Sequence, residues 1–126
     1  MTATEHPLQF LILCGPGDAE RATMGLQMAI AAACSGVAVR VFLAHHATAW
    51  ACAHPPEDED YAAIHRLLDK IRGLGGHLSC CSACADKHCM THEEHTEMPE
   101  LREGVDLAGL VTVTRSAVHG ANTLVF

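Results

Sequence analysis

Residues 78–98 hold the densest group of sulfur and imidazole side chains in the chain. The segment reads LSCCSACADKHCMTHEEHTEM and contains four of the seven cysteines and three of the ten histidines. Within it, Cys81 and Cys84 have the Cys-x-x-Cys spacing, which places two sulfurs one turn apart on the same face of a helix. Thiols at this spacing exchange with disulfides or bind a metal. We therefore take this segment as the candidate site.

Cys81 stands where a predicted short strand, residues 77–80, gives way to a helical segment, residues 82–87. A thiol at a helix start faces free backbone N–H groups and the positive end of the helix dipole, and both lower its pKa. We therefore expect Cys81 to be a reactive thiolate and Cys84 to be its exchange partner. The alternative is that both are small buried side chains, because free cysteine is among the most buried residue types.

A second pattern in the same segment would suit a metal ion. Cys81, Cys84, His88, His92 and His95 follow one another at intervals of three, four, four and three residues. A continued helix would align them as one stripe of sulfur and nitrogen ligands for Zn²⁺ or a softer ion. The gap from Cys84 to His88 is far shorter than the roughly 12 residues between the ligand pairs of a zinc finger. The acids around His92 and His95 are equally typical of a solvated face, so metal binding is the alternative hypothesis.

The flanking sequence predicts the elements that position these residues. Apolar runs that end in turns predict strands over 8–14, 37–44, 77–80 and 121–126. Helical spacing predicts helices over 19–35 and 61–73 and shorter ones over 98–103 and 114–119. This alternation indicates βαβ units, and hence an α/β fold with a mainly parallel sheet of about five strands and helices on both sides.

In such a sheet the loops that follow the strands meet at one edge, where ligands collect. The loops at Gly15, at 44–46 and at 80–81 should therefore lie together. His45 or His46 could then stabilise the Cys81 thiolate as an imidazolium, or lie at the surface as a polar loop residue. The Gly15-Pro16-Gly17 sequence indicates a tight turn, since it lacks the Lys-Ser/Thr of a phosphate loop. Cys34, on an alanine-rich helix, is expected in the core.

Composition excludes several functions. The 126 residues fit one domain, 1–126, and 49% of them are apolar. A net charge of -7 with eight scattered basic residues argues against nucleic acid or a membrane surface as partner. No run approaches the roughly 18 apolar residues of a membrane helix. No signal-peptide pattern opens the sequence, so we expect a cytoplasmic protein with reduced, metal-bound or transiently oxidised thiols.

Four motifs together resemble the DsrE/DsrF-like proteins. They are Phe10–Leu13 followed by Asp18–Arg21, Val39–Ala44, His77–Asp86, and Leu101–Val105 with the closing Val125–Phe126. The family includes sulfur-relay subunits that act in tRNA thiolation and in sulfur oxidation. The resemblance covers nearly the whole chain and implies a three-layer flavodoxin-like fold, assembly as homotrimers or hexamers, and a persulfide on a cysteine at a strand end. By position that cysteine is Cys81, and the second family cysteine is Cys84.

The sequence departs from the family at His88-Cys89, where Arg-Gly is frequent, and over residues 90–97, which are rich in His and Glu. The resulting hypothesis is a cysteine-dependent sulfur carrier of sulfurtransferase type without a cofactor. Cys81 would accept sulfane sulfur from a donor protein and pass it to an acceptor protein, with Cys84 releasing the product. The alternatives are a zinc-binding protein that uses residues 81–95, or a non-catalytic oligomer that assembles through the apolar segment 105–113.

Overall fold

Five parallel strands form the central sheet of the computed structural model, which describes residues 6–88 and 100–126. The strands lie in the order β4-β3-β2-β1-β5, and every neighbouring pair is parallel. Their bounds are β1 Leu8–Ile12, β2 Val39–Leu43, β3 His77–Cys81, β4 Val105–Ala108 and β5 Asn122–Val125. The predicted α/β fold with a mainly parallel five-stranded sheet is therefore confirmed.

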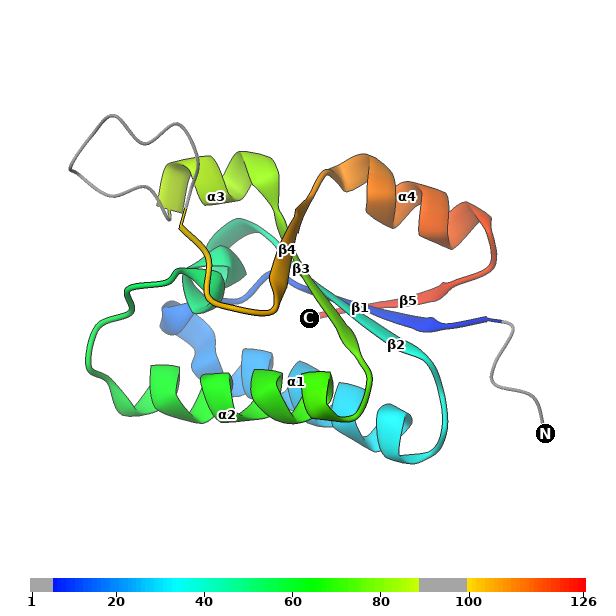
Figure 1. Ribbon diagram of the computed structural model, residues 1–126, viewed down its shortest axis with the longest axis horizontal. Coiled ribbons are helices and arrows are strands. Elements are labelled where there is room, and N and C mark those ends of the chain that lie inside the picture. Colours follow the sequence, from blue (N-terminus) through cyan, green and yellow to red (C-terminus); the bar gives the residue numbers. More distant parts are fainter. Residues whose placement is uncertain (1–5, 89–99) are drawn as a thin grey trace.

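In the described part of the chain, helices cover both faces of the sheet (Figure 1). Helices α1 (Ala19–Cys34) and α2 (Glu59–Gly73) lie together below it, and α3 (Ser82–His88) and α4 (Leu110–Val118) lie above it. Two short 3₁₀ helices, η1 (Pro16–Asp18) and η2 (His45–Ala51), follow β1 and β2 at their carboxyl ends. Asp58, the residue before α2, caps this helix, because its side chain accepts hydrogen bonds from the backbone N–H groups of Asp60 and Tyr61.

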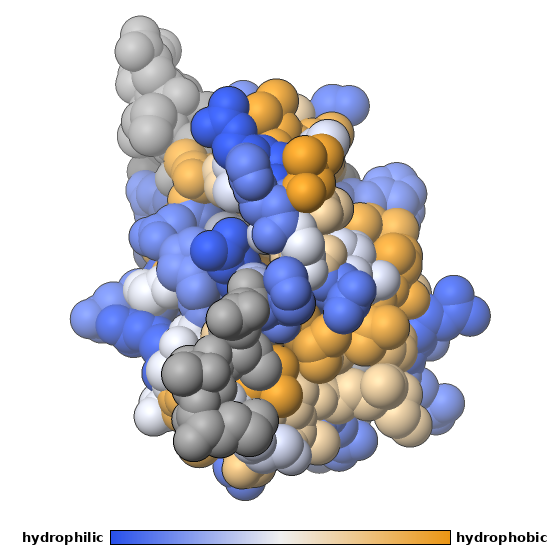
Figure 2. All heavy atoms as spheres, turned by 90° about the vertical axis from the view of Figure 1, so that its right-hand side faces the viewer, coloured by the Kyte–Doolittle hydropathy of each residue, from blue (hydrophilic) through white to orange (hydrophobic). Residues whose placement is uncertain are grey.

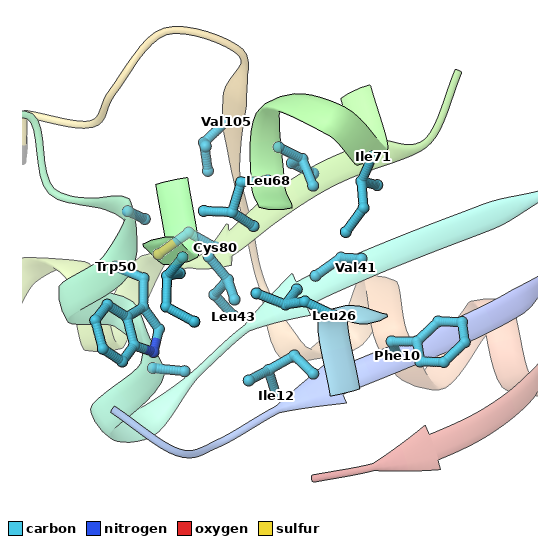
Figure 3. Packing of buried hydrophobic residues seen from close by; sticks show 14 of the residues in the cluster. Phe10, Ile12, Leu26, Val41, Leu43, Trp50, Leu68, Ile71, Cys80 and Val105 are labelled. Atoms are coloured by element: carbon cyan, nitrogen blue, oxygen red, sulfur yellow. The ribbon is translucent and has the colours of Figure 1, made fainter. Parts of the chain in front are cut away.

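The main core lies between the sheet and the pair α1 and α2 (Figure 3). Alternate strand residues point to this side, among them Phe10 and Ile12 of β1 and Val41 and Leu43 of β2. Trp50 of η2 is fully buried at one end of this core, where its ring meets Tyr61 edge-on with centroids 4.9 Å apart. The segment that follows β2 is therefore anchored rather than a loose surface connection.

Four sequence expectations need correction. The described residues of the expected 98–103 helix, 100–103, are not helical: Leu101 forms an antiparallel bridge with Cys52, and Glu103 begins a turn. The apolar run 105–113 is divided between β4 and the start of α4, so α4 begins four residues before the expected 114. Cys34 is exposed near the end of α1 rather than in the core. The 45–51 segment, expected to be a connection, is the helix η2.

In the ranges 6–88 and 100–126, no helix is both long and apolar enough to span a membrane.

Candidate functional site

The carboxyl ends of β1, β2 and β3 meet as the strand order requires. Ile12 pairs with Leu43, and Leu43 pairs with Cys80, so the three strands end side by side. The N–H of Ala44 donates to the carbonyl of Ile12 at 3.0 Å, and η2 then packs against α3. The predicted meeting of the three loops is therefore confirmed.

His45 connects two of these loops through its backbone. Its N–H donates to the Sγ of Cys84 at 3.2 Å. Its φ of 54° lies in the left-handed region, where residues other than glycine are uncommon, and such conformations concentrate at functional sites. The His45 imidazole instead contacts that of His46, with ring centroids 4.0 Å apart and the ring planes tilted by 32°. The predicted pairing of an imidazolium with the Cys81 thiolate stays a prediction.

The adjacent cysteines at the end of β3 face opposite sides of the sheet, because strand side chains alternate. Cys80 points into the main core, as Figure 3 shows, and burial raises the pKa of its thiol to about 12. Cys81 lies on the other face, in a second apolar cluster with Phe42 and Ala44 that Cys84 also contacts. Of this pair, Cys81 therefore shares an apolar cluster with Cys84.

The reactivity expected of Cys81 from its place at a helix start is not what the folded chain gives. Cys81 is 2% exposed, and burial raises the pKa of its thiol. The backbone N–H groups of Cys84 and Ala83 act in the opposite direction, as the sequence predicted, but the loss of solvation outweighs them. A hydrogen bond with the Cys84 side chain further raises the pKa of Cys81, so the two thiols are in direct contact. The prediction of a lowered pKa was wrong because it left out the apolar cover.

Cys84 is half-buried and lies in the first turn of α3. Of the predicted metal ligands, His88 ends α3, while His92 and His95 lie outside the described residues. Among the residues that the structure describes, no group of three or more His, Cys, Asp or Glu side chains is arranged to hold a metal ion. Cys14, Cys34, Cys80, Cys81 and Cys84 are free thiols, and Cys52 is disulfide-bonded.

A cavity of about 440 Å³ opens beside this junction, between η1 and η2. Cys14, the turn 15–18 and the two adjacent histidines His45 and His46 line it. The carbonyl of Cys14 accepts the indole N–H of Trp50 at 2.8 Å, which fixes the wall of the cavity to the core. The sequence pattern at Gly15-Pro16-Gly17 indicated only a tight turn. The position of this turn directly after a predicted strand, with Cys14 as the last residue of that strand, was the signal that would have placed both here.

Comparisons with known proteins agree on the fold. The E. coli YchN protein matches with a TM-score of 0.74 and 20% identity over 96% of this chain and 99% of its own. MTH1491 of Methanobacterium thermoautotrophicum, described as a protein of unknown function, matches with a TM-score of 0.68 and 15% identity, over 96% of this chain and 99% of its own. No curated protein matches the sequence. A family model, that of the DsrE/DsrF-like family, matches residues 8–126. The chain therefore belongs to the DsrE/DsrF-like family, which is associated with sulfur relay.

Proposed function

We propose that the chain is a sulfur carrier in which Cys84 and Cys81 receive, hold and pass on a sulfane sulfur. The observation that supports this most directly is the contact between the buried Cys81 thiol and the half-buried Cys84 thiol. The backbone N–H of His45 donates to the Sγ of Cys84. A hydrogen-bond donor at that position would stabilise the negative charge that a persulfide sulfur bears during transfer.

The two thiols have different roles in this proposal because they differ in exposure. Cys84 is the thiol that a donor protein can reach, whereas Cys81 is covered by apolar side chains. The Cys84 thiolate attacks the outer sulfur of a donor persulfide, and the donor leaves as a thiolate when its own S–S bond breaks. The Cys81 thiolate then attacks the same sulfur, which forms a Cys81 persulfide and regenerates the Cys84 thiolate. Delivery to an acceptor thiol runs in reverse order, and no oxidant is needed.

The apolar cover of Cys81 gives a reason for the second step. A persulfide stored beside Phe42 and Ala44 is shielded from water and from small thiols that would reduce it. An alternative end to the cycle is attack by Cys84 on the inner sulfur of the Cys81 persulfide. This attack would release sulfide and leave a disulfide between the two cysteines.

The test is to load the purified protein with polysulfide and follow the added sulfur by intact mass. Cys84→Ser should load more slowly than the parent, and Cys81→Ser should hold sulfur that dithiothreitol removes faster. Cys34→Ser, which removes an exposed thiol on the opposite face of the sheet, is the matched control and should behave as the parent. If the double variant at positions 81 and 84 takes up as much sulfur as the parent, the proposal is wrong.

We also propose that the chain assembles with copies of itself through α4 and the edge strand β5. Of the nine residues of α4, all of them described, only Ser116 is buried. Val111 is 67% and Val118 77% exposed, and Val125 on β5 is 57% exposed. Figure 2 views the side at the right of Figure 1 and shows hydrophobic side chains over much of this face. Apolar helix surface and an unpaired strand edge are both typical of subunit contacts.

A further inference from the structure

A polar groove lies on the upper face of the sheet beneath α4, in the half of the sheet where the strands begin. It consists of two adjoining cavities of about 410 and 320 Å³, which share Arg40 and Thr112 as lining residues. The first is also lined by Arg115, Ser116 and His119 of α4 and its cap, and the second by residues of β1, β2 and β3. Phe42, which lines the second cavity, also packs beside Cys81, but no cysteine lines either cavity.

The groove is lined by two arginines, Arg40 and Arg115. None of the described residues that line either cavity is acidic. Each recorded ion pair joins other residues, so Arg40 and Arg115 have no carboxylate within 4.0 Å among the described residues. The nearby Asp106 is engaged by His77 at 2.8 Å.

Hydrogen bonds fix the geometry of this groove. The Arg40 guanidinium donates to the Ser116 hydroxyl at 3.1 Å, which leaves its other N–H groups available to a ligand. Ser116 is only 8% exposed, and the described chain records no acceptor for its own hydroxyl proton. The buried Gln9 amide forms part of the floor and is held by the carbonyl of Val113 at 3.2 Å and the Thr123 hydroxyl at 3.0 Å.

The end of α4 does not oppose an anion strongly. Helix C-termini carry partial negative charge on unpaired carbonyls. Here the N–H of His119 bonds the carbonyl of Arg115 at 3.0 Å, and the N–H of Ala121 bonds that of Ser116 at 3.0 Å. These carbonyls are therefore paired, and the two arginine side chains dominate the local charge.

We propose that this groove binds an oxyanion, either free phosphate or sulfate or the same group as an ester. Arg40 and Arg115 supply the charge, with N–H groups arranged for the planar, two-point contacts that guanidinium makes to phosphate. The Ser116 and Thr112 hydroxyls supply neutral donors. The adjoining cavity, which Phe42 and Ser79 line, gives room for the organic part of an ester. The inference is independent of the sulfur chemistry proposed for Cys81 and Cys84.

The experiment is a titration of the full chain with inorganic phosphate, in which binding is monitored by the NMR signals of backbone amides and arginine side chains. Chloride keeps the ionic strength constant. We expect saturable shifts at residues of α4 and β2. Arg40→Gln should weaken binding by at least about tenfold, because it removes a charged hydrogen-bond donor. Arg66→Gln is the matched control, since Arg66 is an exposed arginine of α2 on the opposite face. Ser116→Ala, which keeps both arginines, should weaken binding less.

A parallel titration with ribose 5-phosphate distinguishes the two sources of the oxyanion. Tighter binding of the ester identifies an ester as the ligand, and equal binding identifies the free ion. The proposal is overturned if phosphate shifts are linear in concentration and identical in Arg40→Gln and Arg66→Gln. It is also overturned if phosphate has no saturable effect while Arg40→Gln or Arg115→Gln dissociates an oligomer, because the groove would then be a subunit contact. Far-UV circular dichroism checks that each variant is folded.

Discussion

The close packing of the turn after β1 against η2 can be tested by adding one methyl group at Gly15. Its backbone, at φ −106° and ψ −155°, is extended and open to alanine, so strain in the main chain is not at issue. A Cβ at this position would instead collide with the carbonyl oxygen of His46 and lie 2.7 Å from its carbonyl carbon. Because both atoms are backbone, they can move only if η2 moves. Gly17 lines the same cavity and has no heavy atom within 4 Å of its Cβ position.

The two glycines therefore form a matched pair. Gly15→Ala adds a methyl group to an occupied space, and overpacking of this kind costs about 1–3 kcal/mol of unfolding free energy. At roughly 4 °C per kcal/mol for a domain of this size, Tm should fall by about 4–12 °C. Gly17→Ala should be neutral, or stabilising by up to about 1 kcal/mol, because alanine restricts the unfolded chain. A shift of η2 would also move the His45 N–H away from the Cys84 sulfur.

Urea unfolding gives the stability of both variants, and iodoacetamide labelling with peptide mass spectrometry gives the rate at which Cys84 reacts. We expect the labelling rate at Cys84 to change in Gly15→Ala and to stay at the parent value in Gly17→Ala. If the two variants unfold within about 0.5 kcal/mol of each other, the range of an ordinary surface substitution, the close approach of the β1 turn to η2 is refuted.

Two further predictions concern the buried thiol and the exposed helix. Burial raises the pKa of Cys81, so in a variant that retains only this cysteine its labelling rate should rise with pH through a midpoint above the roughly 8.5 of a free thiol. In guanidinium, which unfolds the chain, the midpoint should return to about 8.5. The raised pKa also means that the Cys81 thiol contributes fully to folding stability below its pKa in the unfolded chain, and that this contribution is lost as the pH rises through its pKa in the folded chain. A labelling midpoint in the folded protein at or below the midpoint in guanidinium would contradict the prediction. The Val118 side chain is 77% exposed, and Val118→Asp should lower the mass measured by light scattering while leaving the fold intact. Thr114 is also exposed but polar, so Thr114→Asp should lower the mass less. Equal masses for parent and Val118→Asp would exclude α4 as the subunit contact.

Local sequence patterns determined much of this protein. The β-branched and apolar runs at 8–12 and 39–43 form strands wherever they are buried, and the spacing of Ile64, Leu68 and Ile71 suits only a helix. Their alternation predicted the parallel sheet, and the sheet predicted that residues 15, 45 and 81 would meet. The pair Cys81 and Cys84 was visible because helical spacing is local. Residues close in sequence decided each helix and strand, and the general rule that parallel strands end at one edge of a sheet then placed their loops together.

Only the tertiary structure decided the burial, the hydrogen-bond partners and the charge environment of the site residues. The helix start at Ser82 was predicted, but the apolar cover that raises the pKa of Cys81 comes from Phe42 of β2 and from Ala44 just after it, far away in the sequence. The His45 N–H donates to Cys84 while His45, at the start of η2, has a left-handed backbone conformation. No residue pattern in the sequence predicts that conformation. Arg40 and Arg115 are 75 residues apart and share a groove only after the sheet forms. Desolvation and charge depend on distances in space, and the sequence specifies these distances only through the complete fold.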